Sequence, residues 1–243
     1  MTNSNKNIIL LILIAGCFQV STAKEGWMPD IYEFGVIEES DGPRQGRFSY
    51  VNTSDSSKVI NNVRPTCGCT TVDFTQEVIN PGDTASLIFE FNPEGRPGKF
   101  DKNIKVYLSG ESSPISLSFS GIVKASEKTL TYRFPVGEGH IRMETDEIKA
   151  GELPKGSRKH AFVGIYNNSE ELLTPYITTD SDIVNINLVP KVLEAYESCS
   201  LSIFIDTRKI SQTGFQECEV RISSEEYPEE EQLLRISLFI TNP

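Results

Sequence analysis

The sequence predicts an all-β protein in which two tandem immunoglobulin-like antiparallel β-sandwiches follow an N-terminal signal segment. Three observations lead to this fold class. Apolar residues recur with a period of two from Ile31 onward, clusters of Asn, Pro, Gly and Asp separate the alternating runs, and no segment carries a sustained apolar stripe at helical spacing. Alternation of this kind is typical of strands that bury one face.

The first half of the chain contains seven expected strands. The clearest lies within Ile115–Ile122, where apolar residues occupy every odd position until Gly121. Seven short strands in about 100 residues indicate an immunoglobulin-like sandwich. The strands are expected at residues 31–37, 46–52, 58–64, 69–74, 84–91, 101–108 and 114–123.

The second half repeats the first with looser similarity. Arg47–Ser54 resembles Ala161–Ser169, and Gly82–Asn92 resembles Tyr196–Asp206. A repeat of this length indicates that each half forms one structural unit. The expected domains are residues 24–123 and 140–243, joined by a polar linker at residues 124–139.

The N-terminus has the features of a secretory signal at residues 1–23. Its apolar run, Ile8–Phe18, contains 11 residues, too few for the ~20 that a membrane-spanning helix needs. Two processing routes stay open: cleavage after Ala23, or lipidation of Cys17 at the end of Ile14–Cys17, which resembles a bacterial lipobox. We therefore expect an exported protein that is periplasmic, anchored to the outer membrane as a lipoprotein, or secreted.

Charge and composition narrow the functional classes. The chain has 243 residues, of which 34 are acidic and 23 basic, and its net charge is −11. Such a surface repels phosphate backbones, so no nucleic-acid partner is expected, and contact with a membrane is expected only through a lipid at Cys17. With two histidines and no nucleophile-elbow or phosphate-binding motif, no catalytic residues are assigned.

Four motifs in the first half occur in a specific order. They are Tyr32–Ile37, Pro65–Thr71 with its Cys-Gly-Cys core, Ile79–Asp83 and Phe91–Phe100. Over residues 30–123 this order resembles the bacterial domain of unknown function fifteen seventy-three. The resemblance implies an immunoglobulin-like fold and an exported protein of the Bacteroidetes type. It implies no activity, and the second half resembles a divergent second copy that lacks the Cys-Gly-Cys motif.

Cys67, Gly68 and Cys69 form the most distinctive chemical motif. Two cysteines two residues apart on a strand point to the same side, with Cα atoms ~6.5 Å apart if the backbone is extended. A glycine between them can adopt positive φ and bring them closer. Three interpretations stay open: packed thiols or a small disulfide with a structural role, a Cu(I) site, and reversible thiol redox chemistry or covalent partner capture.

Strand topology places three basic residues near this motif. Alternate loops of a sandwich emerge at opposite ends, so the loop at 65–69 and the loop at 92–100 share one end, close to the second domain. We expect Arg64, Arg96 and Lys99 to gather near the sulfurs and to lower the pKa of the thiols. The alternative is that residues 92–99 form only a rigid turn.

Cys199 and Cys218 belong to the second half. Each shares the alternation of the apolar residues around it, so both are expected to point inward from strands that face each other across the core. A disulfide and a pair of packed free thiols are both compatible with this placement.

These observations lead to a non-enzymatic adaptor or scaffold of the cell envelope that binds a protein or a glycan, without a cofactor. The alternative is an envelope protein that binds Cu(I) or performs thiol redox chemistry through Cys67 and Cys69. An unrecognised hydrolase is a third hypothesis. The sequence contains no feature that identifies the partner.

Overall fold

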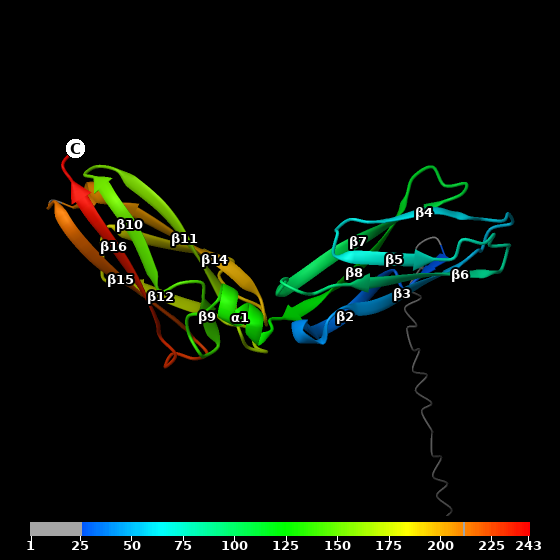
Figure 1. Ribbon diagram of the computed structural model, residues 1–243, viewed down its shortest axis with the longest axis horizontal. Helices are drawn as coiled ribbons and strands as arrows, with labels where there is room; N and C mark the ends of the chain where they lie inside the picture. Colours follow the sequence, from blue (N-terminus) through cyan, green and yellow to red (C-terminus); the bar gives the residue numbers. More distant parts are fainter. Residues whose placement is uncertain (1–25, 211) are drawn as a thin grey trace, which may run out of the picture.

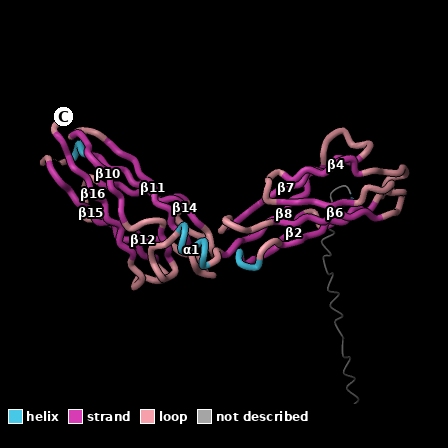
Figure 2. The backbone as a smooth tube through the Cα atoms, in the orientation of Figure 1, coloured by secondary structure: helices cyan, strands magenta, loops and turns pink. Residues whose placement is uncertain are grey.

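The computed structural model describes residues 26–210 and 212–243 and has two β-sandwich domains that lie end to end (Figure 1). Four four-stranded sheets build the two domains, and helices are limited to short pieces (Figure 2). The predicted fold class is therefore confirmed. Cys17 and Ala23 lie outside the described residues. Within the described part of the chain, no helix is long and apolar enough to cross a membrane.

The first domain has one sheet in the order β1-β3-β6-β5 and a second in the order β2-β8-β7-β4. Each strand predicted for this half is present, and β1 is an additional short strand. Their bounds are β1 Trp27–Met28, β2 Ile31–Glu38, β3 Arg44–Val51, β4 Ile60–Pro65, β5 Thr70–Phe74, β6 Thr84–Phe91, β7 Gly98–Leu108 and β8 Ile115–Lys124.

The second domain has the same strand order, with β9-β11-β14-β13 and β10-β16-β15-β12 as its sheets. The repeat seen in the sequence is thus a repeat of topology, strand for strand. The bounds are β9 Ile141–Met143, β10 Glu147–Pro154, β11 Arg158–Asn167, β12 Pro175–Thr179, β13 Val184–Val189, β14 Ser198–Asp206, β15 Gly214–Ser224 and β16 Gln232–Thr241.

Not every strand pair is antiparallel, and this corrects the expectation of purely antiparallel sandwiches. In each domain the first long strand pairs in parallel with the last, β2 with β8 and β10 with β16. Strand direction alternates along the chain, so the first and seventh long strands of a domain run the same way. When those two strands become neighbours in a sheet, their pairing is necessarily parallel.

The two cores differ in composition. Aromatic rings dominate the first core, where Phe89 packs against Phe48 and Phe119 with ring centroids 5.2 and 4.6 Å apart. The buried core of the second domain, as far as the structure describes it, consists of Ile, Leu, Val, Ala, Met and Cys side chains without Phe. Each core is separate, so each domain buries its own apolar surface.

The segment between the domains is more ordered than the predicted polar linker at residues 124–139. It begins with the last residue of β8 and contains the helix α1 Glu127–Arg133, and two short 3-10 turns, η2 Glu39–Asp41 and η3 Thr207–Lys209, lie elsewhere. The Ser126 side chain caps α1 by accepting a hydrogen bond from the Thr129 N–H. Seven residues give too few turns for a helical period to show in the sequence.

A buried asparagine fixes the same loop in both domains. Asn52 follows β3, is fully buried, and donates from Nδ2 to the carbonyl oxygens of Ser56 (2.9 Å) and Ile79 (2.8 Å). Its Oδ1 accepts hydrogen bonds from the N–H and the hydroxyl of Ser54. One side chain therefore satisfies donors and acceptors of two loop segments at once.

Asn167 makes the equivalent contacts at the end of β11. Its Nδ2 donates to the carbonyl oxygens of Glu171, Leu193 and Glu194, and its Oδ1 accepts from the N–H and the hydroxyl of Ser169. The triplets Asn52-Thr53-Ser54 and Asn167-Asn168-Ser169 are thus the same structural device used twice, and we call them the asparagine clamps.

Removing a clamp should destabilise its own domain. Asn52→Ala removes the two hydrogen bonds that Nδ2 donates and the acceptor of the Ser54 N–H and hydroxyl, so the first domain is expected to lose about 2–3 kcal/mol of unfolding free energy. Urea unfolding followed by the fluorescence of Trp27, the single tryptophan, measures that domain. Asn167→Ala should leave the Trp27 transition almost unchanged, and the exposed Asn61→Ala serves as the control. Equal effects of all three substitutions would contradict the clamp.

Candidate functional site

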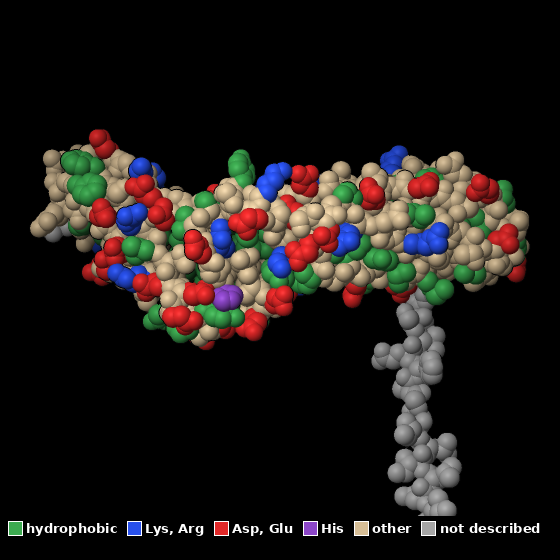
Figure 3. Space-filling model, turned by 60° about the horizontal axis from the view of Figure 1, so that its bottom comes forward, with side chains coloured by type: hydrophobic (Ala, Val, Ile, Leu, Met, Phe, Trp, Pro, Cys, Tyr) green, Lys and Arg blue, Asp and Glu red, His purple; other side chains and the backbone are tan. Residues whose placement is uncertain are grey.

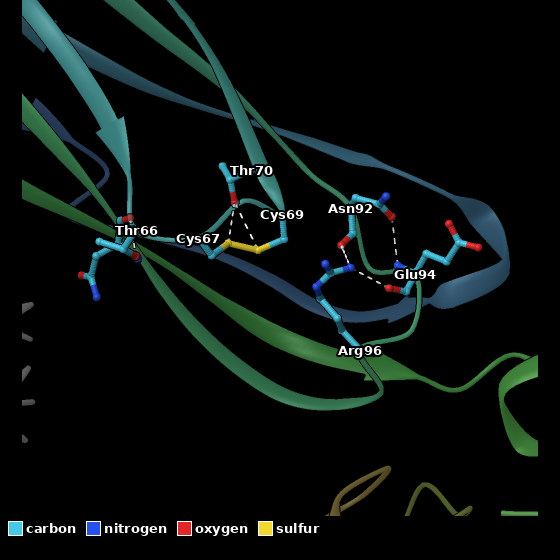
Figure 4. The surroundings of a disulfide bond; sticks show 8 residues. Thr66, Cys67, Cys69, Thr70, Asn92, Glu94 and Arg96 are labelled. Carbon is cyan, nitrogen blue, oxygen red and sulfur yellow. Dashed lines mark hydrogen bonds between the residues drawn. A yellow bond between two sulfur atoms is a disulfide. The ribbon is translucent and has the colours of Figure 1, made fainter. Parts of the chain in front are cut away.

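The Cys-Gly-Cys motif lies in the loop between β4 and β5, and its two cysteines form a disulfide (Figure 4). Their Cα atoms are 5.3 Å apart, closer than in an extended strand, because the chain turns at these residues. Gly68 achieves this without positive φ, contrary to the expected role of that residue. Cys67 is partly exposed and Cys69 is buried.

Two threonines hold this loop in place. The Thr70 hydroxyl lies 3.4 Å from Sγ of Cys67 and 3.7 Å from Sγ of Cys69, and it acts as the donor because disulfide sulfurs carry no proton. The Thr66 hydroxyl donates to the carbonyl oxygen of Asn103 on β7 (2.9 Å). The disulfide loop is therefore tied to both sheets of the first domain.

The turn at residues 92–97 lies beside the disulfide, as topology predicted. The Asn92 N–H donates to the carbonyl oxygen of Cys69 (2.9 Å). Arg96 stays within this turn, where its Nη1 donates to the carbonyl oxygens of Glu94 (2.6 Å) and Asn92 (3.4 Å) (Figure 4). The arginine therefore stiffens the turn, which matches the alternative that this segment is a rigid turn.

The other two basic residues have partners elsewhere. The Arg64 guanidinium lies over the ring of Tyr107, 5.6 Å from its centroid. Lys99 forms an ion pair with Glu194 of the second domain (3.2 Å). Arg64 and Lys99 thus interact with groups other than the sulfurs, and the expected lowering of the thiol pKa does not apply because disulfide sulfurs do not titrate.

Cys199 and Cys218 are free thiols. They lie on opposite sheets as expected, but at different positions along the strand direction. Cys199 stands near the start of β14, whereas Cys218 donates a hydrogen bond to the Ser181 hydroxyl (3.1 Å), close to the Ile183–Asp206 contact at the end of β14. Seven residues separate Cys199 from Asp206, roughly 23 Å along a strand, which is far beyond disulfide reach.

Burial keeps both free thiols protonated. It raises the pKa of Cys199 to about 12, with a smaller contribution from the nearby Glu197 carboxylate. Burial also raises the pKa of Cys218 and outweighs the hydrogen bond to Ser181, which lowers it. Because the thiolate is the reactive form, these cysteines are packing residues.

A buried carboxylate beside the same turn joins the two domains. Glu39 is 6% exposed; its Oε1 accepts from the Gly95 N–H (2.6 Å) and the Thr129 hydroxyl (2.7 Å), and its Oε2 accepts from the Ser126 N–H (2.7 Å). These donors come from the 92–97 turn and from the capped start of α1. Glu39 therefore fixes α1 to the first domain.

The other side of α1 belongs to the second domain. Leu130 and Phe134 pack in a buried cluster with Tyr166 and Tyr196, and the Ala125 N–H donates to the Tyr166 hydroxyl oxygen (3.0 Å). Burial raises the pKa of Tyr166 to about 12, so this phenol stays neutral. Sequence reasoning missed this joint. The one available signal was Ser126, a residue type that is preferred at the start of a helix.

A hollow of about 820 Å³ lies next to the joint, between α1 and the turns that contain Glu39 and Gly95. Tyr132 on α1 lines it and is highly exposed. The structure brings no three His, Cys, Asp or Glu side chains together in a metal-ligating group among the described residues.

Two sandwiches with one shared strand order define a tandem immunoglobulin-like β protein. The first of them, residues 26–123, matches the family model described as "Protein of unknown function (DUF1573)". The resemblance inferred from the sequence is therefore confirmed for this domain. No curated protein matches the chain.

Solved structures offer distant likenesses. A protein of unknown function from Porphyromonas gingivalis W83 aligns over 88% of this chain and 98% of its own, with 15% identity and a TM-score of 0.37. The secreted serine protease VesC of Vibrio cholerae aligns over 81% of this chain and 49% of its own (12%, 0.37), so this chain spans about half of that protease. The CupB2 chaperone of Pseudomonas aeruginosa aligns over 83% and 95% (9%, 0.30).

The joint should depend on pH through Glu39. Burial alone raises the pKa of this carboxyl, but the hydrogen bonds from Ser126, Thr129 and Gly95 outweigh it and hold the pKa below its ordinary value of 4.5. The charged form is thus favoured by folding. Its stabilisation is complete above the ordinary value and is lost as the pH falls through the lowered pKa of the folded state.

Glu39→Gln tests this dependence. The amide nitrogen meets a backbone donor, so we expect the variant to lose about 1–3 kcal/mol at neutral pH. The difference from wild type should shrink in acid, where Glu39 itself is protonated. Urea unfolding at neutral and acidic pH measures both values, with the exposed Glu90→Gln as control. A difference that stays constant with pH would rule out the charged carboxylate as its source.

Proposed function

We propose that this protein is a non-enzymatic adaptor or scaffold of the bacterial cell envelope, exported by the segment at residues 1–23, that binds a protein or a glycan. The observation that carries the proposal is the joint. Glu39 holds α1 to the first domain while Tyr166 and Tyr196 hold it to the second. The two sandwiches therefore present their surfaces in a fixed relative orientation.

A fixed orientation matters for binding more than for chemistry. A linker without such contacts would leave the domains mobile, and a ligand that touches both would have to restrict that motion at a cost in free energy. Buried hydrogen bonds and a packed cluster meet this cost during folding instead. The predicted export signal and the resemblance to a family found in exported bacterial proteins support the proposed cellular location.

Two measurements on the full chain test this function. Intact mass of the protein recovered from native envelopes should show processing after Ala23 or a lipid on Cys17. The purified protein should then bind isolated envelopes saturably, as measured by co-sedimentation. An unprocessed chain in the cytoplasmic fraction, or binding that never saturates, would refute the proposal.

Reversible thiol chemistry is the second candidate, and the partly exposed Cys67–Cys69 disulfide favours it. The step would be a two-electron exchange, in which the disulfide becomes two thiols while a partner dithiol becomes a disulfide. A disulfide between cysteines two positions apart closes a small ring, and a small ring favours reduction. Cu(I) binding requires the reduced form, because thiolates bind the ion.

Thiol counting, envelope binding and Cu(I) uptake together separate the adaptor candidate from the thiol candidate. The native chain should give no adduct with an alkylating agent at neutral pH, because the raised pKa keeps Cys199 and Cys218 protonated and therefore unreactive. After mild reduction we expect two adducts, and none in a Cys67→Ser, Cys69→Ser double variant. If the adaptor proposal holds, this double variant binds envelopes like wild type and the reduced chain takes up no stoichiometric Cu(I). Loss of envelope binding in the variant would favour the thiol candidate.

A further inference from the structure

One sheet face of the second domain differs from the other outer faces of the molecule. On the outside of β13-β14-β11, register aligns Asn185 with Phe204 and His160, and the next row aligns Asn187 with Ser202 and Phe162. Ser200 extends β14 toward the joint. We call this surface the neutral face: His160, Phe162, Asn185, Asn187, Ser200, Ser202 and Phe204.

The aromatic rings of the neutral face form one connected group that stays open to solvent. The His160 ring stacks on Phe204 with centroids 4.0 Å apart and lies 4.2 Å from Phe162. Phe162 is 60% exposed and Phe204 44% exposed. Exposed large rings at neighbouring positions of an open sheet leave apolar area uncovered, and such area marks an interaction site.

The polar side chains of this face are not engaged within the protein. The amides of Asn185 and Asn187 and the hydroxyls of Ser200 and Ser202 make no side-chain hydrogen bond to any described residue. These groups offer donors and acceptors directly beside the rings. They are therefore available to a ligand.

The other three outer sheet faces carry charged side chains along their strands, and one of them combines these with the exposed pair Phe215 and Phe239. Figure 3 shows acidic side chains (red) spread over both domains with basic ones (blue) among them. Outward positions on the remaining sheets hold Arg47, Asp73 and Glu90; Lys99, Asp101 and Lys105; and Glu217, Glu219, Arg221 and Arg235. In contrast, the neutral face meets charge only at its ends. At one end the Glu144 carboxylate accepts a hydrogen bond from the Gly164 N–H, beside Ser200, and at the other Arg158 and Arg208 pair with Asp206.

That end also provides a hollow of about 370 Å³, lined by Arg158, His160, Asn185, Phe204 and Asp206 among others. Its size lies within the range of small-molecule sites. The flat neutral face thus runs into a concave subsite with an aromatic wall, an amide, Lys159, and Asp206, which pairs with both Arg158 and Arg208. Because the hollow lies at one end of the face, it gives a bound chain a defined orientation and offers a place for its terminal or branching group.

We propose that the neutral face binds a neutral oligosaccharide. Aromatic rings pack against the apolar C–H face of a pyranose, and free amides and hydroxyls pair with its hydroxyl groups. The amides, hydroxyls and phenylalanine rings of this face give no electrostatic attraction to an acidic glycan or a phosphate, and the overall charge of −11 repels both. The inference rests on the proposed adaptor function and names its ligand class as a glycan.

Titration calorimetry with defined tetrasaccharides tests the proposal. The probes are cellotetraose, chitotetraose and mannotetraose, with tetragalacturonate as the acidic counterpart. At least one neutral probe should bind with millimolar or tighter affinity, and tetragalacturonate at least tenfold more weakly. Phe162→Ala and Phe204→Ala should each weaken binding at least tenfold, equivalent to ~1.4 kcal/mol. Phe239→Ala, which removes a 47% exposed ring from the opposite sheet, should have no effect.

Several results would overturn the inference. These are no binding of any neutral probe, equal binding of tetragalacturonate, or equal sensitivity to Phe239→Ala. Self-association that sedimentation detects in wild type and not in Phe162→Ala would make the face an interface between copies of this chain.

The envelope co-sedimentation assay separates this inference from the adaptor function. If Phe162→Ala binds envelopes like wild type, the neutral face is not the binding surface and the adaptor function stands. If that variant loses envelope binding while no tetrasaccharide binds, the neutral face is the binding surface but its ligand is not a neutral oligosaccharide. If wild type itself does not bind envelopes, the adaptor function fails whatever the tetrasaccharides do.

Discussion

The position of helix α1 between the two domains depends on a buried carboxylate, Glu39. A buried charge is stable only when hydrogen bonds replace the water that it has lost, and here donors from Gly95, Ser126 and Thr129 do so. These donors belong to the 92–97 turn and to the start of α1, two segments that the Lys128–Glu94 ion pair (3.3 Å) also joins. The same contacts that make the charge tolerable therefore set the position of α1, and with it the second domain.

Much of the fold was predictable because strands with one buried face leave an alternating pattern in the sequence. The expected strands at 84–91 and 31–37 match β6 and β2 to within one residue. Helix α1 was not predicted because its seven residues bury little beyond Leu130. The parallel pairing of β2 with β8 was not predicted because alternation determines which face of a strand is buried, but not which strands become neighbours.

The candidate sites show the same limit. Cys67 and Cys69 were placed correctly beside the 92–97 turn because every second loop of a sandwich emerges at the same end. The positions of Cys199 and Cys218 along their strands, in contrast, depend on how the two sheets are stacked. Arg64 and Lys99 found partners in Tyr107 and Glu194, which no local pattern predicts. The neutral face likewise needs cross-strand register, since His160 and Phe204 are 44 positions apart in the chain.

The asparagine clamps have a consequence for producing the protein. Both clamps read Asn-X-Ser, the triplet that eukaryotic secretory cells modify with glycans. The enzyme there acts on the emerging chain, before Asn52 and Asn167 are enclosed. A sugar on Nδ2 would replace one of its two hydrogens, which donate to loop carbonyl oxygens in the fold, and would not fit in the buried position of either side chain. Secretion from yeast or animal cells should thus yield misfolded chains, while a bacterial host leaves both amides free to close their loops.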